Sequence, residues 1–150
     1  MHALRYGAAV TLSLLSICGC VAVVSPAPTP SAPVKIELFN ATGRDVRPNL
    51  FVSGSATSED ALFVGGNLFT SFTDRAFAEL RAGETVTLEF DCDELSAAGV
   101  DRPVAFDALA LDVDTAEERI VLIRDTNYDC GATLRFVFFY DGAVFRVRSE

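Results

Sequence analysis

The chain has 150 residues, half of them hydrophobic, and its 21 acidic residues outweigh 12 lysines and arginines to give a formal net charge of −9. This balance argues against nucleic-acid binding and against adsorption to an anionic membrane through a basic patch. His2 is the only histidine. A domain downstream of it therefore has no imidazole for a Ser-His-Asp or Cys-His apparatus or for a histidine-ligated zinc site, and we expect a protein that is not an enzyme.

Residues 1–19 are typical of a signal peptide. Positive charge near the N-terminus from His2 and Arg5 precedes an apolar run from Ala8 to Ile17. At about ten residues this run is too short to span a bilayer. The segment Ile17-Cys18-Gly19-Cys20 resembles the bacterial lipobox, which implies cleavage before Cys20 and lipidation of that cysteine. The alternatives are an ordinary secretory signal that is cut nearby and an uncleaved anchor.

The lipid on Cys20 would hold the mature chain on a membrane without help from its charge. Loss of residues 1–19 removes Arg5 and no acidic residue, which leaves 11 basic against 21 acidic residues, 11 − 21 = −10. The residue after the lipidated cysteine is Val21 and not the aspartate of the best-known inner-membrane retention signal. We therefore expect a lipid-anchored, extracytoplasmic location in the bacterial cell envelope, in the outer membrane where one is present.

Residues 20–33 form a linker of proline, alanine and serine behind the lipidated cysteine. Such a composition favours an extended tether, which at about 3 Å per residue reaches roughly 40 Å. Residues 34–150 show no second linker, so we predict one domain there.

Short segments with alternating apolar and polar residues dominate this domain and predict an antiparallel sheet protein. In the first segment, Val34, Ile36 and Leu38 share one face, and Asn40-Ala41-Thr42, formally a glycosylation sequon, is interpreted as turn chemistry. Further strands are expected at 46–53, 67–73, 85–90, 104–112 and 119–124, and in a hairpin of 133–140 with 143–148 around Asp141-Gly142. Seven or eight strands at this spacing predict an immunoglobulin-like β-sandwich.

Two segments have less regular patterns. Residues 75–80 fit either a short helix or the first arm of a hairpin with 85–90, and we expect the hairpin. Residues 93–99 are predicted to form one or two helical turns, with Asp93 as the N-terminal cap and Gly99 as the stop.

Two cysteines remain in the folded part once Cys18 is removed and Cys20 is acylated. In an oxidising compartment Cys92 and Cys130 should form a disulfide. The alternative is a nucleophilic or metal-binding thiol. Together with the lipobox, the segments Phe90-Asp91-Cys92-Asp93 and Tyr128-Asp129-Cys130-Gly131 resemble uncharacterised small envelope lipoproteins of bacteria. That resemblance implies a location and no activity.

The oxygen-bearing side chains of Asp125, Asn127 and Asp129 stand at alternate positions, as in a calcium loop. The glycine sits one place later than in an EF-hand and no acidic residue closes the site, so a turn that satisfies backbone donors is the simpler interpretation. Calcium is the one cofactor that the sequence suggests.

Three further groups are candidate sites. A carboxylate pair for acid–base chemistry could come from Asp91, Asp93, Glu94 and Asp129, although solvated acids are the alternative. The acidic run Asp107, Asp112, Asp114, Glu117 and Glu118 could face a cationic partner or simply water. A sugar-stacking platform could come from Phe51, Phe69, Phe72, Tyr128 and Tyr140.

Together these patterns favour a non-enzymatic binding or structural module that meets a protein or glycan partner through loops or a free sheet edge. A calcium-assisted carbohydrate-binding domain is the alternative.

Overall fold

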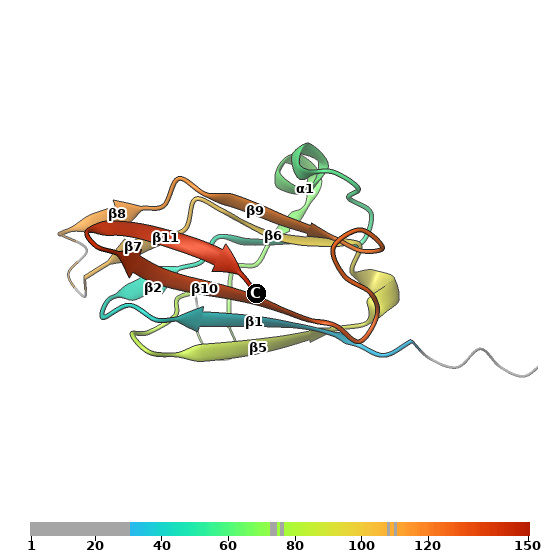
Figure 1. Cartoon of the computed structure of the whole chain (residues 1–150), viewed down its shortest axis with the longest axis horizontal. Coiled ribbons are helices and arrows are strands. Elements are labelled where there is room, and N and C mark those ends of the chain that lie inside the picture. The colour runs from blue at the N-terminus through green and yellow to red at the C-terminus, as the bar shows by residue number, and fades with distance from the viewer. Residues whose placement is uncertain (1–30, 73–74, 76, 108, 110) are drawn as a thin grey trace, which may run out of the picture.

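The computed structural model describes residues 31–72, 75, 77–107, 109 and 111–150. Within these ranges the chain is built mainly from strands, together with one short α-helix, α1 (Glu59–Gly65), and one 3₁₀ helix, η1 (Cys92–Glu94) (Figure 1). None of the described helices is long and apolar enough to cross a membrane.

Two four-stranded sheets and one smaller sheet make up the fold. The first sheet has the order β11 (Val144–Ser149), β10 (Thr133–Asp141), β1 (Val34–Asn40), β5 (Thr85–Phe90). The second has the order β4 (Asn67–Leu68), β3 (Leu50–Ser53), β6 (Ala97–Asp101), β9 (Arg119–Ile123). A third, three-stranded sheet has the order β2 (Asp45–Arg47), β7 (Val104–Phe106), β8 (Val113–Thr115) and lies at the left-hand end of Figure 1.

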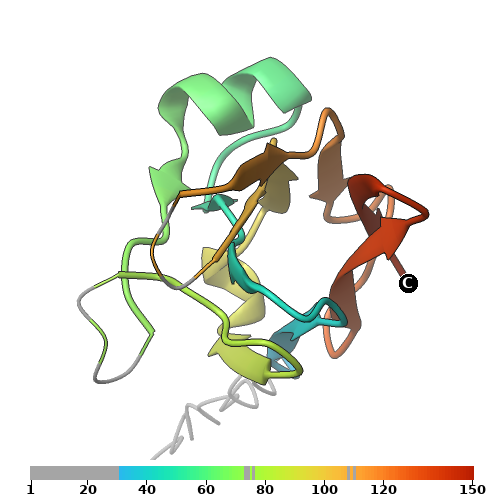
Figure 2. The same ribbon diagram turned by 90° about the vertical axis from the view of Figure 1, so that its left-hand side faces the viewer.

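The core lies between the two larger sheets, which enclose it when the molecule is viewed from the end (Figure 2). In β1 the predicted inner-face residues Val34, Ile36 and Leu38 are all fully buried. Phe136 and Phe138 of β10 fill the same core. The predicted β-sandwich with one disulfide is therefore confirmed. It has eleven strands in the described residues, and β1 and β10 pair in parallel while the other strand pairs are antiparallel.

The predicted strand 46–53 is in fact two strands that belong to different sheets. The chain leaves β2 at Pro48, which has no N–H to donate to a ladder, and Asn49 has a φ of 48°. Val46 and Leu50 remain fully buried, as the alternation predicted. The predicted strand 104–112 likewise ends early, at Phe106.

The prediction of a hairpin between residues 75–80 and 85–90 is wrong, because the first segment does not pair with the second. Leu80 exchanges backbone hydrogen bonds of 2.8 and 2.9 Å with Val46, whereas β5 pairs with β1. The C-terminal hairpin is confirmed with a shift of one residue. Asp141 pairs with Val144, so Gly142 and Ala143 form the loop, and Gly142 has the positive φ of 62°.

The helix expected at residues 93–99 is also wrong, because the chain makes only η1 before entering β6. Ala97, Ala98 and Gly99 lie in a central strand and are buried. The helix of the fold is instead α1, where the Ser58 side chain accepts a hydrogen bond from the Ala61 N–H at 3.2 Å. Leu62 of α1 packs fully buried over β6.

This packing depends on the missing side chain at Gly99. A Cβ atom there would overlap the carbonyl oxygen of Ile120 and lie 2.9 Å from Leu62 Cδ2. We expect Gly99→Ala to lower the free energy of unfolding by about 2 kcal/mol, since the core must shift to make room. In contrast, Gly65→Ala meets no atom within 4 Å and should be neutral or stabilising. Urea unfolding of both variants measures the difference, and equal midpoints would contradict this packing.

Candidate functional site

The described chain begins at one end of the sandwich, which we call the proximal end, and η1 and the turn before β10 lie at the same end (Figure 1). Cys92 and Cys130 are bonded with 5.4 Å between their Cα atoms, which confirms the predicted pairing. The bond ties η1 to the turn before β10. Beside it Tyr128 donates a hydrogen bond to the Leu95 carbonyl at 3.1 Å, and burial raises the pKa of Tyr128 to about 12.

The predicted calcium ligands lie on the turn between β9 and β10. There the side-chain oxygen of Asn127 accepts a hydrogen bond from the Ile123 N–H at 2.8 Å, and Asp125 has a φ of 63°. Asn127 therefore satisfies a backbone donor as the simpler interpretation expected, whereas Asp125 contributes its backbone N–H, which donates to the Tyr128 carbonyl at 2.8 Å. Across the described ranges no three His, Cys, Asp or Glu side chains are grouped to hold a metal ion. Calcium binding by Asp125, Asn127 and Asp129 stays a prediction, and Cys20 lies outside the described residues.

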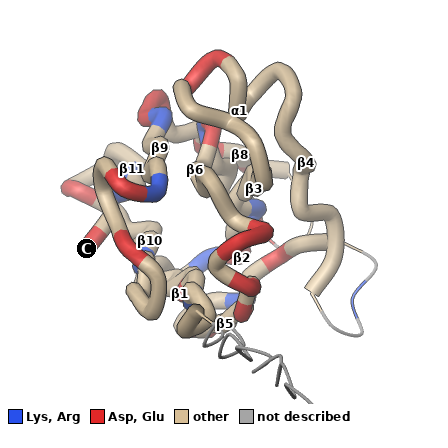
Figure 3. Tube along the Cα trace, turned by 90° about the vertical axis from the view of Figure 1, so that its right-hand side faces the viewer, with Lys and Arg blue, Asp and Glu red and all other residues tan. Residues whose placement is uncertain are grey.

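The acidic residues of the proximal end are exposed. Figure 3 faces this end and shows acidic segments on it. Asp91, Asp93, Glu94 and Asp129 all lie on the surface, so they lack the burial that acid–base chemistry by a carboxyl pair needs.

Two residues of the acidic run 107–118 are half-buried and held by neighbouring side chains. Asp114 Oδ2 accepts hydrogen bonds from Arg44 Nη1 at 2.7 Å and from the Tyr140 hydroxyl at 2.6 Å. Glu118 pairs with Arg146 at 2.7 Å. Burial, and then the bond to Asp114, raise the pKa of Tyr140. Asp114 and Glu118 are therefore structural partners that fasten the segment to the first sheet.

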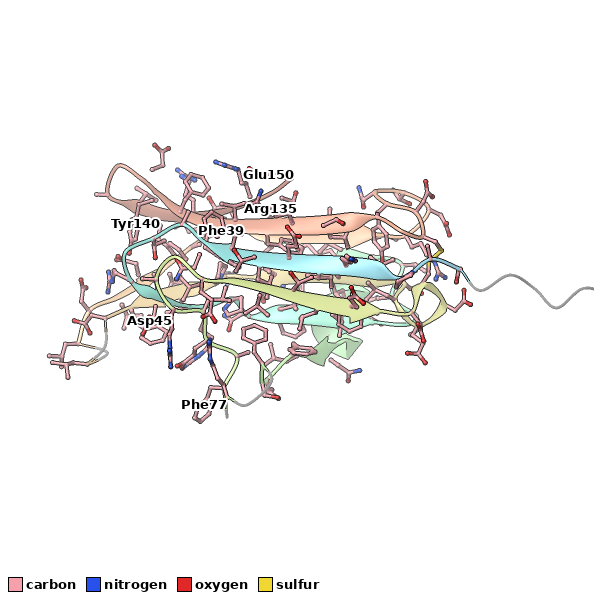
Figure 4. All side chains as sticks on the ribbon, turned by 90° about the horizontal axis from the view of Figure 1, so that it is seen from below. Phe39, Asp45, Phe77, Arg135, Tyr140 and Glu150 are labelled. Carbon is pink, nitrogen blue, oxygen red and sulfur yellow. A yellow bond between two sulfur atoms is a disulfide. The ribbon has the colours of Figure 1, made fainter. Side chains whose placement is uncertain are left out.

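The five rings considered as a sugar platform do not share an exposed surface. Phe72 and Tyr128 are buried. Phe69 stacks on Phe72 with 5.9 Å between ring centroids and is half-buried against the core. The exposed ring is instead Phe77, which points away from the body of the domain (Figure 4). It borders a pocket of about 230 Å³ whose other lining residues are Arg47, Asn49, Leu68, Phe69, Thr70 and Ala78.

At the end opposite to the proximal end, which we call the distal end, lie the β7–β8 connection and the starts of β8 and β11 (Figure 1), and these segments carry exposed aliphatic side chains. Leu109 and Leu111, in the β7–β8 connection, are 77% and 81% exposed, and Val113 and Val144, which begin β8 and β11, are each 53% exposed. We call these four residues the apolar tip. Large apolar side chains gathered at one exposed end are typical of a contact surface.

The apolar tip could have been recognised in the sequence, but residues 104–112 were interpreted as a strand. Leu109 and Leu111 alternate with alanines and not with polar residues, between Asp107 and Asp112. The Asp107 side chain accepts hydrogen bonds from the N–H groups of Leu109 and Leu111, so it shapes a loop where the alternation predicted a strand.

These features define a disulfide-bonded β-sandwich with an apolar distal end. No family model and no curated protein matches the chain. Among solved structures it is similar to a protein from Eubacterium rectale determined by NMR, with 13% identity, a TM-score of 0.40 and coverage of 77% of this chain and 86% of that one. It is also similar to the cytotoxin suilysin from Streptococcus suis, with 9% identity and a TM-score of 0.42. That match covers 80% of this chain, which spans 23% of the suilysin chain.

Proposed function

We propose that the chain is a lipid-anchored, extracytoplasmic module that binds a protein partner through its apolar tip and has no catalytic activity. The anchor in this proposal is the lipobox cysteine Cys20, and the disulfide between Cys92 and Cys130 supports an oxidising compartment outside the cytosol. The absence of histidine after His2 and the acidic balance support a role other than hydrolysis or nucleic-acid binding.

One observation carries this proposal: the domain begins at one end and exposes the apolar tip at the other (Figure 1). A chain tethered through its N-terminus would hold its proximal end toward the membrane and present the distal end outward. The tip is held firmly at its base, because Arg44, Asp114 and Tyr140 join the start of β8 to β10. A rigid base with exposed aliphatic side chains suits a protein contact, since burial of these side chains drives association.

The proposal is tested by exchanging tip residues for smaller or equally large polar ones. In the double variant Leu111→Ser, Val113→Thr, capture of a partner by the full-length protein from native envelope should fall about tenfold, as expected for about 1.4 kcal/mol of lost apolar contact. Val64→Ser is the matched control, because Val64 is 89% exposed but lies on α1, away from the tip. Capture that is equal for the tip variant and the control would reject the tip as the binding surface.

A further inference from the structure

The backbone of β5 has one side paired and one side free. The Asn40 N–H donates to the Glu84 carbonyl at 2.9 Å, and in the same register Leu38 pairs with Val86 and Ile36 with Leu88. Because backbone groups alternate in direction along an antiparallel strand, Val86 and Leu88 direct theirs toward β1. The intervening residues Thr85, Thr87 and Glu89 direct their N–H and C=O groups outward, and in the described part of the chain β5 pairs with no strand except β1.

The side chains of β5 leave this edge open to pairing. Thr85, Thr87 and Glu89 point to solvent, while Val86, Leu88 and Phe90 face the core yet are only half-buried. The strand contains no proline and no inward-pointing charge, which are the usual protections of an edge. Glu89 is already paired with Lys35 at 3.2 Å.

The exposed edge is complementary to itself. If two copies pair antiparallel with Thr87 at the two-fold axis, Thr87 faces Thr87 of the second copy and exchanges both backbone hydrogen bonds with it. Thr85 then faces Glu89 of the second copy, so no like charges are opposed on the outer face. On the inner face Val86 faces Leu88 of the second copy, which covers apolar surface that is half-exposed in one chain. We propose that β5 is a self-association edge on which a second copy of this chain pairs about Thr87.

The other long edge of the same sheet does not have this property. In β11 the outward backbone groups belong to Phe145, Val147 and Ser149, because the neighbouring residues pair with β10. A two-fold axis at Val147 would place Arg146 opposite Arg148 of the second copy, and like charges directly opposite each other are destabilising.

The edges of the second and third sheets are shorter than β5, and one end of β9 is already satisfied. In β9 the outward N–H of Ile123 is taken by the side chain of Asn127, and the Ile123 carbonyl accepts from the Asn127 N–H at 2.8 Å. The strand β4 has two residues, and β2 and β8 have three each. Among the described edges, β5 therefore suits a second copy best.

The test co-expresses full-length chains that carry two different C-terminal tags and measures how much of one tag is recovered with the other. Thr87→Pro removes the outward N–H at the centre of the interface without touching the bonds to β1, and edge strands tolerate proline. Recovery of the second tag should fall about tenfold. The matched control is Ser149→Pro, which removes an outward N–H from β11 at the opposite edge and should leave recovery unchanged.

A charge exchange keeps the test decisive if the proline variant folds poorly. Thr87→Lys and Thr87→Glu should each fail to recover a copy of itself, because the two-fold axis sets like charges against each other, whereas the two variants together should recover each other. Recovery that is equal for wild type, Thr87→Pro and Ser149→Pro would overturn the proposal, as would failure of the mixed charge variants to recover each other. Neither result depends on the apolar tip, so this proposal and the proposed function can fail separately.

Discussion

Replacement of Cys92 and Cys130 by alanine is expected to lower the free energy of unfolding by about 4 kcal/mol. The two cysteines are 38 positions apart, and in the chain-entropy model the bond removes the freedom of a loop of that length from the unfolded chain. The bond joins η1 to the turn before β10, while neither segment is paired to the other through a sheet.

Urea unfolding of the oxidised wild type and the double alanine variant measures this difference. Reduction of the wild-type protein serves as the control, because it should shift the midpoint by a similar amount and leave the variant unchanged. A variant that unfolds at the wild-type midpoint would show that the bond does not stabilise the domain.

Removal of the Asn40 side chain is expected to cost about 3 kcal/mol. Asn40 is fully buried, and its amide nitrogen donates to the carbonyls of Arg44 at 2.7 Å, Arg81 at 3.0 Å and Leu80 at 3.1 Å. Its oxygen accepts from the N–H of Thr42 at 2.9 Å. Asn40→Ala takes one donor from each of the three carbonyls and leaves the N–H of Thr42 without its acceptor. Each lost hydrogen bond costs about 1 kcal/mol and an unsatisfied buried group about 1–3 kcal/mol.

The Asn40→Asp variant separates hydrogen bonding from packing, since it preserves volume but replaces the donating amide nitrogen with a carboxylate oxygen that faces three carbonyl oxygens. It should be at least as unstable as Asn40→Ala at neutral pH. Thr42→Ser keeps the hydroxyl that donates to Asn40 at 2.7 Å and should change little. Thermal and urea unfolding give the comparison, and an aspartate variant as stable as wild type would contradict the role assigned to this amide.

The sequence predicted those strands in which one face alone meets the core. Val34, Ile36 and Leu38 alternate with Lys35 and Glu37, and such alternation indicates a half-buried strand. Asn40 was interpreted correctly as turn chemistry, because asparagine and threonine two residues apart satisfy local backbone groups. The cysteine pair followed from counting the cysteines downstream of the expected signal and lipidation site.

The misassigned segments are those where tertiary packing outweighs local preference. Ala97, Ala98 and Gly99 have no side-chain pattern of a strand, and they form one as the central strand β6, which pairs with β3 and β9 and packs under Leu62 at Gly99. The pairing of β1 with β10 joins residues almost a hundred positions apart, and no local signal specifies it.

The candidate site was harder to predict than the fold, because it depends on which apolar and charged side chains are exposed, and the sequence does not show this. Two leucines separated by one residue fit a buried strand as well as an exposed loop, so the sequence does not show that Leu109 and Leu111 are exposed. Likewise, the acidic run looked free in sequence, yet Asp114 is held by Arg44, which is 70 positions away. A charge pattern does not reveal a partner that distant.

The intact mass of the full-length gene product, purified from the membrane fraction without reductant, tests the central claim most directly. We predict a chain that begins at Cys20 and carries a diacylglycerol, with or without a further acyl chain, and whose mass rises by two hydrogens when the bond between Cys92 and Cys130 is reduced. A soluble cytosolic protein that retains residues 1–19, has no lipid mass and has both late cysteines as free thiols would contradict the account.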